Sequence, residues 1–463
     1  MSTARNRAKS AGALALLTVA LPANLALTAV ALTAVALAVG TRRGGVRTLV
    51  PGRAAAPSPS AGSTGSPVDA RTARRRTVLI SGGKMTKSLA LARAFAADGH
   101  RVVLAETAAY RWTGHRFSRA VDAFHVIPAP DDPGYADALA SLVRAEGVDL
   151  YVPVCSPLSS IYDGAARTQL DGLCEVLHPP EAIVRTVDDK AAFAEAARSF
   201  GLAVPESHRI TDPSQVTEFD FAASPGPFVL KSIAYDPVRR LDLTRIPLAT
   251  PEATRAHVAS LPISESNPWV MQAFAEGEEY CTHTVLRDGR VTVHCVCASS
   301  AVQLNYEAVR MPAIDAWVER FAEGIGATGQ LSFDFIVDAA GEVRAIECNP
   351  RTHSAVTIFH DHPELARAYL GEVDEAIAPR PGSRPTLWLY EELWRILRGH
   401  EPLAALGRIL RGKDAIFAWD DPLPFLLVHH LQIPSLLVRR LVRGTPWHHI
   451  DFNIGKLAEP GGD

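Results

Sequence analysis

The segment LSFDFIVDAAGEVRAIECNPR (331–351) carries three oxygen-bearing side chains that a fold could bring to one point. Its apolar residues alternate with polar ones before Ala340-Gly341, which predicts a β-hairpin turning at that pair. Glu347 and Asn349 would then share one face of the returning strand, with Asp334 almost opposite Glu347. A carboxylate among phenylalanines is costly without a cation, and Mg²⁺ prefers oxygen ligands and often bridges phosphates. The hairpin therefore predicts a magnesium–phosphate site, with a surface hairpin of solvated acids as the alternative.

Lysine is scarce in this chain, with seven lysines among 47 basic residues, so the position of each one is informative. Lys190 follows Asp188 and Asp189, either of which would cap a helix that ends at Gly201. Lys231 lies in the strand pattern PFVLKSIAY. An ammonium group is a point charge suited to phosphate oxygens, although a lone lysine is more often a surface residue. Because both precede the acidic hairpin, we predict that they contact the same phosphates.

The elements that must position these residues follow from the hydrophobic periodicity. Residues 77–107 predict a β–turn–α–β unit, the opening of a doubly wound domain. Its parts are TVLISGG (77–83), the helical pattern 87–100 and RVVLAET (101–107). The turn Ser81-Gly82-Gly83-Lys84 lacks the GxGxxG spacing, so a tight turn of small residues is favoured over an anion site at a helix N-terminus. Residues 268–297 predict a strand and then a hairpin that turns at Asp288-Gly289.

The composition excludes several classes of protein. The 463 residues are 47% hydrophobic and 21% charged, which predicts about three domains and excludes wholesale disorder. A net charge of -3 gives no electrostatic footprint for nucleic acid, so no nucleic-acid partner is expected. The six cysteines form no CxxC pair, which argues against a zinc site or a disulfide framework and favours a cytosolic body.

The N-terminus has the composition of a membrane segment. Residues 11–41 contain no charge and are long enough to cross a bilayer, and basic residues flank them on both sides. Pro22 and Asn24 interrupt the run near its middle. A single anchor with a cytosolic body, a hairpin that re-enters the cytosolic face, and a buried apolar helix are the three interpretations. Residues 48–75 are rich in Pro, Ser, Gly and Ala and predict a disordered linker.

The chain resembles the ATP-grasp superfamily in the order of its motifs, which is Lys190, Lys231, MQAFAEGEE, Asp334 and ECNPR. The resemblance implies an α/β and α+β architecture, in which a Rossmann-like pre-ATP-grasp domain precedes a two-lobed ATP-grasp fold. It also implies ATP and Mg²⁺, or Mn²⁺, as cofactors. The segment SIAYDPVRRLDL departs from the family, because the flap after the second lysine is usually rich in glycine.

Position by position, the resemblance implies a role for each residue of the motifs. Lys190 and Lys231 would hold the phosphates, and Arg351 would hold the transferred phosphoryl group. Gln272, the Ala273 carbonyl and the Ala275 amide would contact the adenine, and Glu279 would contact the ribose. Asp334, Glu347 and Asn349 would hold the metal.

A narrower resemblance covers nearly the whole chain. Six segments are similar to mycosporine-glycine synthetases, namely SGGKMTKSLALARAF, TGHRFSRA, YVPVCSP, LKSIAYDPVRRLDLT, IECNPRTHSA and IDFNIGKL. The implied reaction joins 4-deoxygadusol to glycine, with ATP converted to ADP and phosphate. As hypotheses, Arg239 or Arg240 would hold the glycine carboxylate, Asn305 would line the ring pocket and His353 would accept the amine proton. An amide-forming carboxylate–amine ligase and a non-catalytic ATP-binding membrane protein are the alternatives.

We therefore expect five parts in the chain. These are a membrane segment (1–47), a linker (48–75), a pre-ATP-grasp domain (76–155), an ATP-grasp domain (156–380) and a helical C-terminal region (381–463). In the last part, residues 422–444 combine an apolar stretch with Arg439, Arg440 and Arg443. Such a segment either lies on an anionic membrane or packs on the enzyme body.

Overall fold

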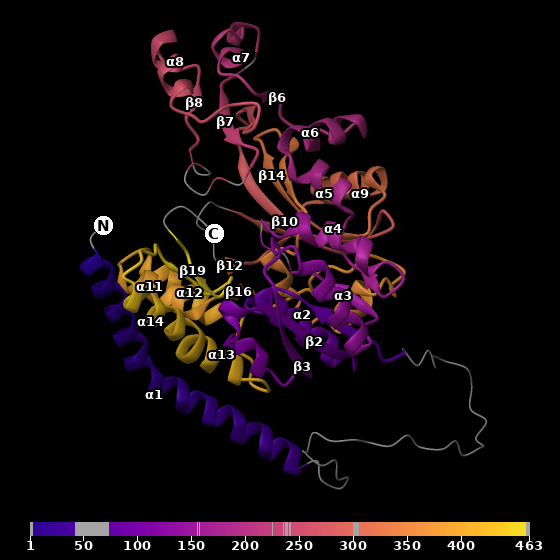
Figure 1. The fold of residues 1–463 in the computed structure, drawn as a ribbon, viewed down its shortest axis with the longest axis vertical. Helices are drawn as coiled ribbons and strands as arrows, with labels where there is room; N and C mark the ends of the chain where they lie inside the picture. The colour runs from indigo at the N-terminus through magenta and orange to yellow at the C-terminus, as the bar shows by residue number, and fades with distance from the viewer. Residues whose placement is uncertain are drawn as a thin grey trace, which may run out of the picture.

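The structure is a computed structural model that describes residues 3–41, 74–154, 156, 158–224, 226–234, 236, 239, 242–299 and 305–459. Figure 1 shows the chain as a tall molecule with one long helix, α1 (Thr3–Thr41), along its lower left side. A parallel sheet lies in the lower half, two antiparallel sheets form the upper half, and the C-terminal helices pack beside the parallel sheet.

The first domain is doubly wound, as predicted. Its five parallel strands have the order β3-β2-β1-β4-β5, and strand β1 is buried because its residues are β-branched or otherwise apolar. The sheet does not end at residue 155, since its last strand follows a further helix. The elements are β1 (Thr77–Ile80), α2 (Thr86–Ala97), β2 (Arg101–Thr107), η1 (Ala108–Tyr110), η2 (Gly114–Phe117), β3 (Ala123–Ile127), α3 (Tyr135–Glu146), β4 (Leu150–Val152), α4 (Ser160–Leu170) and β5 (Glu175–Val176).

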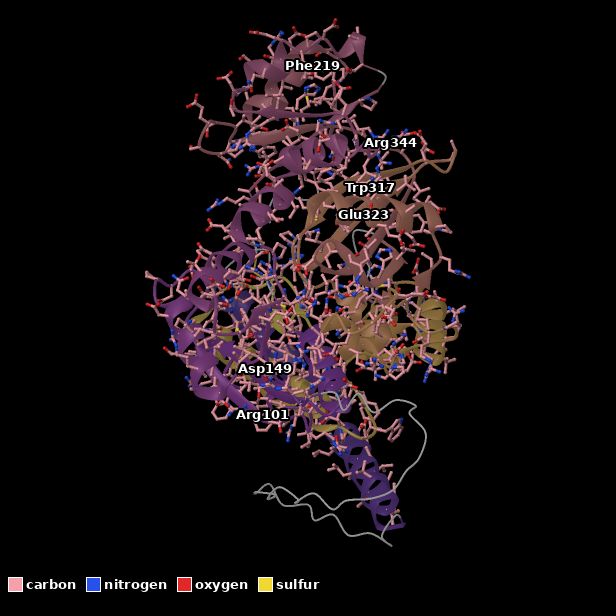
Figure 2. The ribbon with its side chains drawn as sticks, turned by 90° about the vertical axis from the view of Figure 1, so that its right-hand side faces the viewer. Arg101, Asp149, Phe219, Trp317, Glu323 and Arg344 are labelled. Atoms are coloured by element: carbon pink, nitrogen blue, oxygen red, sulfur yellow. The ribbon has the colours of Figure 1, made fainter. Side chains whose placement is uncertain are left out.

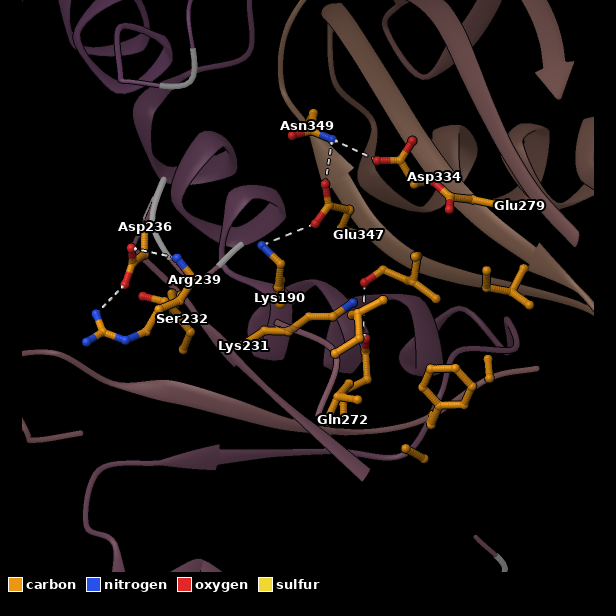
Figure 3. A pocket seen from close by; sticks show the side chains of 18 of the residues that line it. Lys190, Lys231, Ser232, Asp236, Arg239, Gln272, Glu279, Asp334, Glu347 and Asn349 are labelled. Carbon is orange, nitrogen blue, oxygen red and sulfur yellow. Dashed lines mark hydrogen bonds and ion pairs between the residues drawn. The ribbon is translucent and has the colours of Figure 1, made fainter. Parts of the chain in front are cut away.

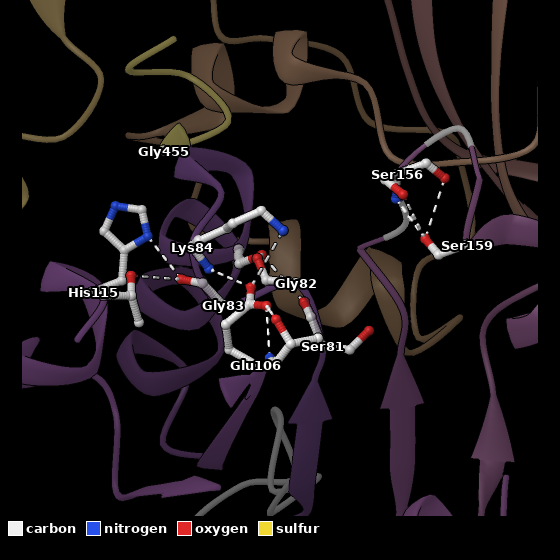
Figure 4. Close-up of polar contacts among 12 residues, drawn as sticks. Ser81, Gly82, Gly83, Lys84, Glu106, His115, Ser156, Ser159 and Gly455 are labelled. Atoms are coloured by element: carbon white, nitrogen blue, oxygen red, sulfur yellow. Dashed lines mark hydrogen bonds and ion pairs between the residues drawn. The ribbon is translucent and has the colours of Figure 1, made fainter. Parts of the chain in front are cut away.

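The turn after β1 is a tight turn rather than an anion site (Figure 4). Gly82 has φ +65°, and a Cβ there would lie 2.2 Å from the Val154 carbonyl oxygen. The backbone amide of Lys84 donates to the Glu106 carboxylate over 3.0 Å, and the Lys84 ammonium lies 3.7 Å from the same oxygen. The chain's own carboxylate therefore occupies the place that an external anion would take.

The upper half consists of two lobes, each built on an antiparallel sheet. The sheet of the small lobe has the order β6-β9-β7-β8, and that of the large lobe β13-β11-β10-β14-β15. Figure 2 labels Phe219 in the small lobe and Trp317 in the aromatic core of the large lobe, where its ring stacks on Phe321.

The elements of the lobes have the following bounds. The connecting helices and the small lobe are α5 (Glu181–Asp188), α6 (Lys190–Ser199), β6 (Ser207–Ile210), α7 (Ser214–Thr217), η3 (Phe221–Ala223), β7 (Phe228–Ser232), β8 (Arg245–Ile246), α8 (Pro251–Ala259) and β9 (Trp269–Ala273). The large lobe comprises β10 (Glu278–Arg287), β11 (Arg290–Ala298), β13 (Ala308–Val309), α9 (Pro312–Ile325), β14 (Gly329–Val337) and β15 (Val343–Asn349). Both predicted hairpin turns are confirmed, at Asp288-Gly289 and at Ala340-Gly341.

The C-terminal region packs into the core of the doubly wound domain instead of forming a separate body. Buried Phe425, Val428 and Leu437 belong to the same hydrophobic cluster as Val78 and Leu104. The remaining elements are β12 (Asn305–Tyr306), η4 (Ser354–Phe359), α10 (Leu365–Tyr369), β16 (Thr386–Leu387), α11 (Leu389–Leu397), α12 (Pro402–Arg411), β17 (Lys413–Asp414), α13 (Leu423–Leu427), η5 (Val428–Gln432), α14 (Ile433–Arg443), β18 (Ile450–Asp451) and β19 (Lys456–Leu457).

Gln432 is the clearest link between these distant parts of the chain. Its carbonyl oxygen accepts from the Thr113 hydroxyl and the Gly114 amide, and its own amide donates to the Gly455 carbonyl. Because Gln432 is buried, these bonds replace water completely at this point. The segment 422–444 therefore packs on the body, which was one of its two predicted interpretations.

Candidate functional site

A cavity of about 720 Å³ lies between the sheets of the two lobes (Figure 3). All ten residues predicted to hold nucleotide or metal line it. They are Lys190, Lys231, Gln272, Ala273, Ala275, Glu279, Asp334, Glu347, Asn349 and Arg351. These residues come from both lobes, from the segment between them and from helix α6, so only the tertiary fold brings them together.

Strands β14 and β15 place the acidic side chains as the alternation predicted. Asp334 and Glu347 are register partners, and Ser332 pairs with Asn349. The Asn349 side-chain amide donates to Asp334 over 3.3 Å and to Glu347 over 3.1 Å, which draws the two carboxylates together. Burial, and then the neighbouring Glu347, raise the pKa of Asp334 well above its usual value. The Arg351 cation acts in the opposite direction but does not offset these two effects.

This set of donors fits a divalent ion that also binds phosphate. Two carboxylates and an amide oxygen are hard ligands, too few for a cage made of protein alone, and Mg²⁺ characteristically combines one or two carboxylates with substrate phosphates. Within the described residues no cluster of three or more His, Cys, Asp or Glu side chains is placed to hold a metal. These three side chains therefore fit a metal ion that is bound together with a phosphate ligand.

Lys190 opens helix α6 and faces the acidic strands. Asp189 caps this helix by accepting from the amides of Ala191 and Ala192, which settles the choice between the two predicted caps. The Lys190 ammonium lies 3.2 Å from Glu347. Burial alone would lower the pKa of Lys190, but the Glu347 and Asp188 carboxylates together outweigh this effect and the pKa is raised. In turn Lys190 lowers the pKa of Glu347 well below its usual value.

Lys231, near the end of β7, points into the cavity beside Gln272. Its ammonium donates to the Gln272 carbonyl oxygen over 3.3 Å, and burial lowers its pKa. The Gln272 amide donates across the cavity to the Ile346 carbonyl of β15 over 3.2 Å. The carbonyl oxygen predicted to meet adenine therefore already has a donor, which a nucleotide would have to share or displace.

The segment that links the lobes lines the side predicted for adenine. The amides of Ala273 and Phe274 donate to the carbonyls of Glu206 and Pro227, each over 2.8 Å. The guanidinium of Arg245 lies 3.9 Å from the centre of the Phe274 ring, so a cation–aromatic pair forms part of the wall. The Glu279 carboxylate accepts from the Ser299 hydroxyl over 3.2 Å.

The loop that carries Arg351 is fixed by the doubly wound domain. The ammonium of Lys87, buried at the start of α2, donates to the Thr352 carbonyl over 2.6 Å, and the Ser160 hydroxyl donates to the Pro350 carbonyl over 2.6 Å. The two bonds flank Arg351 on either side. The first domain therefore positions this cation at the cavity, a role that the sequence motifs did not indicate.

Of the residues predicted to contact the substrates, only some line the cavity. Arg239 lines the cavity but pairs with Asp236 over 3.2 Å, and Arg240 lies outside the described residues. Asn305, in β12, and His353 are not among the residues that line the cavity. The His353 ring accepts from the Ala355 amide and lies edge-on to Tyr306. Burial lowers the pKa of His353 to about 3, so its imidazole is a weak base at neutral pH.

Three acids that line the cavity, Asp188, Asp236 and Glu276, received no role there from the sequence, and Asp188 is the one that a pattern could have indicated. Asp188 was considered only as a helix cap, yet it ends α5, lines the cavity, and burial raises its pKa. The Asp188-Asp189 doublet was the available signal, since one aspartate suffices to cap a helix and the second is then free to face a site.

The Asp189 cap, which fixes the start of the helix that carries Lys190, can be tested by its contribution to stability. Replacing Asp189 by alanine removes two hydrogen bonds at the start of α6 and an ion pair with Arg209. We expect a loss of about 1 kcal/mol in the free energy of unfolding, measured by urea titration. The control is Glu195→Ala on the exposed face of the same helix, which should change stability little. Equal effects of the two substitutions would contradict the assignment of the cap.

Comparison with known proteins gives similarity in structure only. No protein-family model matches the sequence, and no curated protein matches it. Among solved structures, N5-carboxyaminoimidazole synthetase from Staphylococcus aureus in complex with ADP has a TM-score of 0.52 at 13% identity, over 71% of this chain and 86% of that chain. Phosphoribosylamine–glycine ligase from Thermotoga maritima has a TM-score of 0.50 at 16% identity, over 67% and 78% of the two chains. Identities this low show the fold alone. These neighbours are ATP-grasp ligases, and this chain has the ATP-grasp fold, with a doubly wound domain followed by two lobes that enclose a cavity.

Proposed function

We propose that this protein is an ATP-dependent ligase that forms a carbon–nitrogen bond and releases ADP and phosphate. One observation carries the proposal. Three cations and two carboxylates converge on a single cavity between the lobes: Lys190, Lys231 and Arg351 against Asp334 and Glu347. Cations of this kind suit the phosphates of ATP, and the carboxylates suit the metal that accompanies them.

Each residue has a physical task in phosphoryl transfer. Lys190 and Lys231 would bind the phosphates of ATP, and Arg351 would stabilise the charge on the phosphoryl group as it moves. Asp334, Glu347 and Asn349 would hold Mg²⁺, or Mn²⁺, which when bound neutralises phosphate charge. Gln272, Ala273 and Ala275 would contact the adenine, and Glu279 the ribose. Catalysis would then consist of positioning and charge neutralisation.

For the substrates we propose 4-deoxygadusol and glycine. The support is the set of sequence segments similar to mycosporine-glycine synthetases. Two of these segments, LKSIAYDPVRRLDLT and IECNPRTHSA, contribute described residues to the lining of the cavity, among them Lys231, Arg239 and Glu347. The γ-phosphoryl group moves from ATP to an enol oxygen of 4-deoxygadusol. The bond between the γ-phosphorus and the bridging oxygen breaks to leave ADP, and the enol proton is released to solvent. The glycine amine then attacks the carbon that bears this oxygen, a carbon–nitrogen bond forms, and the carbon–oxygen bond breaks as phosphate leaves. The amine gives up one proton, which the departing phosphate can take.

The glycine carboxylate needs a cation, and Arg239 is the candidate that lines the cavity. It would have to exchange its partner Asp236 for the substrate. The low pKa of His353 and its place outside the lining argue against our hypothesis that it accepts the amine proton, so we assign it no step.

The test is to incubate the full chain with ATP, Mg²⁺, 4-deoxygadusol and a mixture of the twenty amino acids, and to record ADP and product masses. We expect ADP release that requires 4-deoxygadusol and a single adduct with the mass of mycosporine-glycine. An adduct with another amino acid would keep the reaction and change the substrate. ADP release that requires only a carboxylic acid would instead show an amide-forming ligase. ATP binding without turnover, with substrates and vesicles present, would favour a non-catalytic protein.

A further inference from the structure

Helix α1 packs against the body along one side only. It has 39 residues, and at 1.5 Å per residue it is roughly 58 Å long. Its buried and half-buried positions recur every three or four residues from Asn6 to Ala31, which is the spacing of one helix face. This face lies on α14 and α13, as Figure 1 shows. By length and composition α1 could cross a membrane, but its contacts describe a helix laid along a protein surface.

Three polar residues of α1 lie on this buried face and bond to the body. The Asn6 amide donates to the Gly444 carbonyl over 3.1 Å, and Ser10 accepts from the Trp447 indole over 3.0 Å. Farther along, the Asn24 amide lies 2.6 Å from the Tyr390 hydroxyl. Asn24, which interrupts the apolar run in the sequence, is therefore a docking residue.

The opposite face of α1 is apolar and exposed. No charge occurs between Lys9 and Arg42, and the side chains of Val19, Val30 and Leu37 are 79%, 59% and 65% exposed. Water is a poor solvent for such a continuous surface, and exposed apolar patches of this kind mark contact with a membrane or a protein.

A second apolar surface lies beside it on the hairpin of α11 and α12. Tyr390, at the start of α11, is the residue that meets Asn24 of α1. Leu397, Leu403 and Leu410 are 72%, 84% and 72% exposed, and the last two are seven residues apart on one face of α12. Two neighbouring elements thus expose large apolar side chains, and the charged residues Arg398 and Glu401 are exposed at the tip of the hairpin.

We propose that α1 lies flat in one leaflet of a membrane that contains anionic lipid, and that the α11–α12 hairpin inserts beside it. Charge favours lipid over a second copy of the chain. Residues 3–41 contain three basic residues and no acid, and residues 422–450, which include α14, contain three arginines and no acid. Two copies would bring these like charges together, whereas an anionic surface complements them.

A helix that spans the bilayer does not fit these contacts. Residues 6–31 of α1 pack along the body over roughly 38 Å, which exceeds the hydrocarbon thickness of about 30 Å. Spanning would therefore draw α14 into the hydrocarbon with it. That helix carries Arg439, Arg440 and Arg443, and arginines are costly there.

The first experiment measures how deeply three positions of α1 lie in the membrane. Val19, Val30 and Leu37 are replaced one at a time by cysteine in the full chain, labelled with an environment-sensitive fluorophore and bound to phosphatidylserine–phosphatidylcholine vesicles. The unsubstituted chain, with its six cysteines, gives the labelling background. We expect lipid spin labels to quench all three positions at the same shallow depth. A depth that changes steadily across residues 19–37 would show a spanning helix and overturn the proposal.

The second experiment tests the hairpin. Leu403→Glu combined with Leu410→Glu should weaken co-sedimentation with the same vesicles at least tenfold, with no change in thermal unfolding. The control, Ala256→Glu with Ala259→Glu, adds the same charge to exposed positions of α8 at the far end of the molecule (Figure 1) and should bind normally. Normal binding by the α12 variant would overturn the hairpin's role. Failure of the unsubstituted chain to bind, together with a dimer in solution, would assign the surface to a second copy.

Discussion

Replacing Glu347 by glutamine is expected to lower the rate of ADP release at saturating substrates about a thousandfold. The substitution keeps the size of the side chain and the hydrogen bond from Asn349, but it removes the charge that faces Lys190 at 3.2 Å and one of two carboxylates available to a metal. The fold should persist, because the residue is only half-buried and lies at a cavity.

The matched control for this variant is Glu342→Gln. Glu342 precedes the same strand, is exposed, and pairs with Arg344 on the surface. Its loss should change turnover less than twofold, since exposed ion pairs contribute little. If the Glu347 variant stayed within threefold of the unsubstituted protein, the assignment of the acidic hairpin as the metal site would be wrong.

Replacing Lys231 by methionine should separate stability from function. Burial lowers the pKa of Lys231 from 10.5, so at neutral pH the folded protein holds a charge that is less favourable there than in the unfolded chain. This cost is fully present below the lowered pKa and disappears above pH 10.5. At pH 7 the variant should therefore be as stable as the unsubstituted protein or more so, while kcat/KM for ATP falls at least a hundredfold.

Lys413→Met is the control for burial alone. Lys413 is half-buried, as Lys231 is, and burial lowers its pKa to about 8. It donates to the carbonyls of Asp414 and Phe417, away from the cavity. This variant should retain kcat/KM for ATP. Equal activity of the two methionine variants would show that Lys231 does not contact the nucleotide.

The acidic hairpin was predictable because its information is local. The alternation before Ala340-Gly341 determines which side chains share a face, and the register of β14 and β15 brought Asp334 opposite Glu347 as expected. The cap of α6 and the turn at Asp288-Gly289 are local in the same sense. In each case the decisive residues lie within about fifteen positions of one another.

Other features depend on contacts between distant segments and could not be predicted in this way. The sequence left two interpretations of residues 422–444 open, because their packing on the body depends on bonds from Gln432 to Thr113 and Gly114. The link from Lys87 to the loop of Arg351 joins residues 265 positions apart. The apolar run at the N-terminus predicted a membrane segment, but the face of α1 that meets the body became visible only with α14 in place.

One measurement tests the proposed reaction most directly, namely the fate of the substrate oxygen. The protein is supplied with ATP, Mg²⁺, glycine and 4-deoxygadusol freshly labelled with ¹⁸O at the reacting enol oxygen, and the released phosphate is analysed by mass. In a parallel reaction only the glycine carboxylate carries the label. We predict that phosphate acquires one ¹⁸O from 4-deoxygadusol and none from glycine. Label transferred from glycine, or from neither substrate, would contradict a phosphorylated 4-deoxygadusol and with it the proposed function.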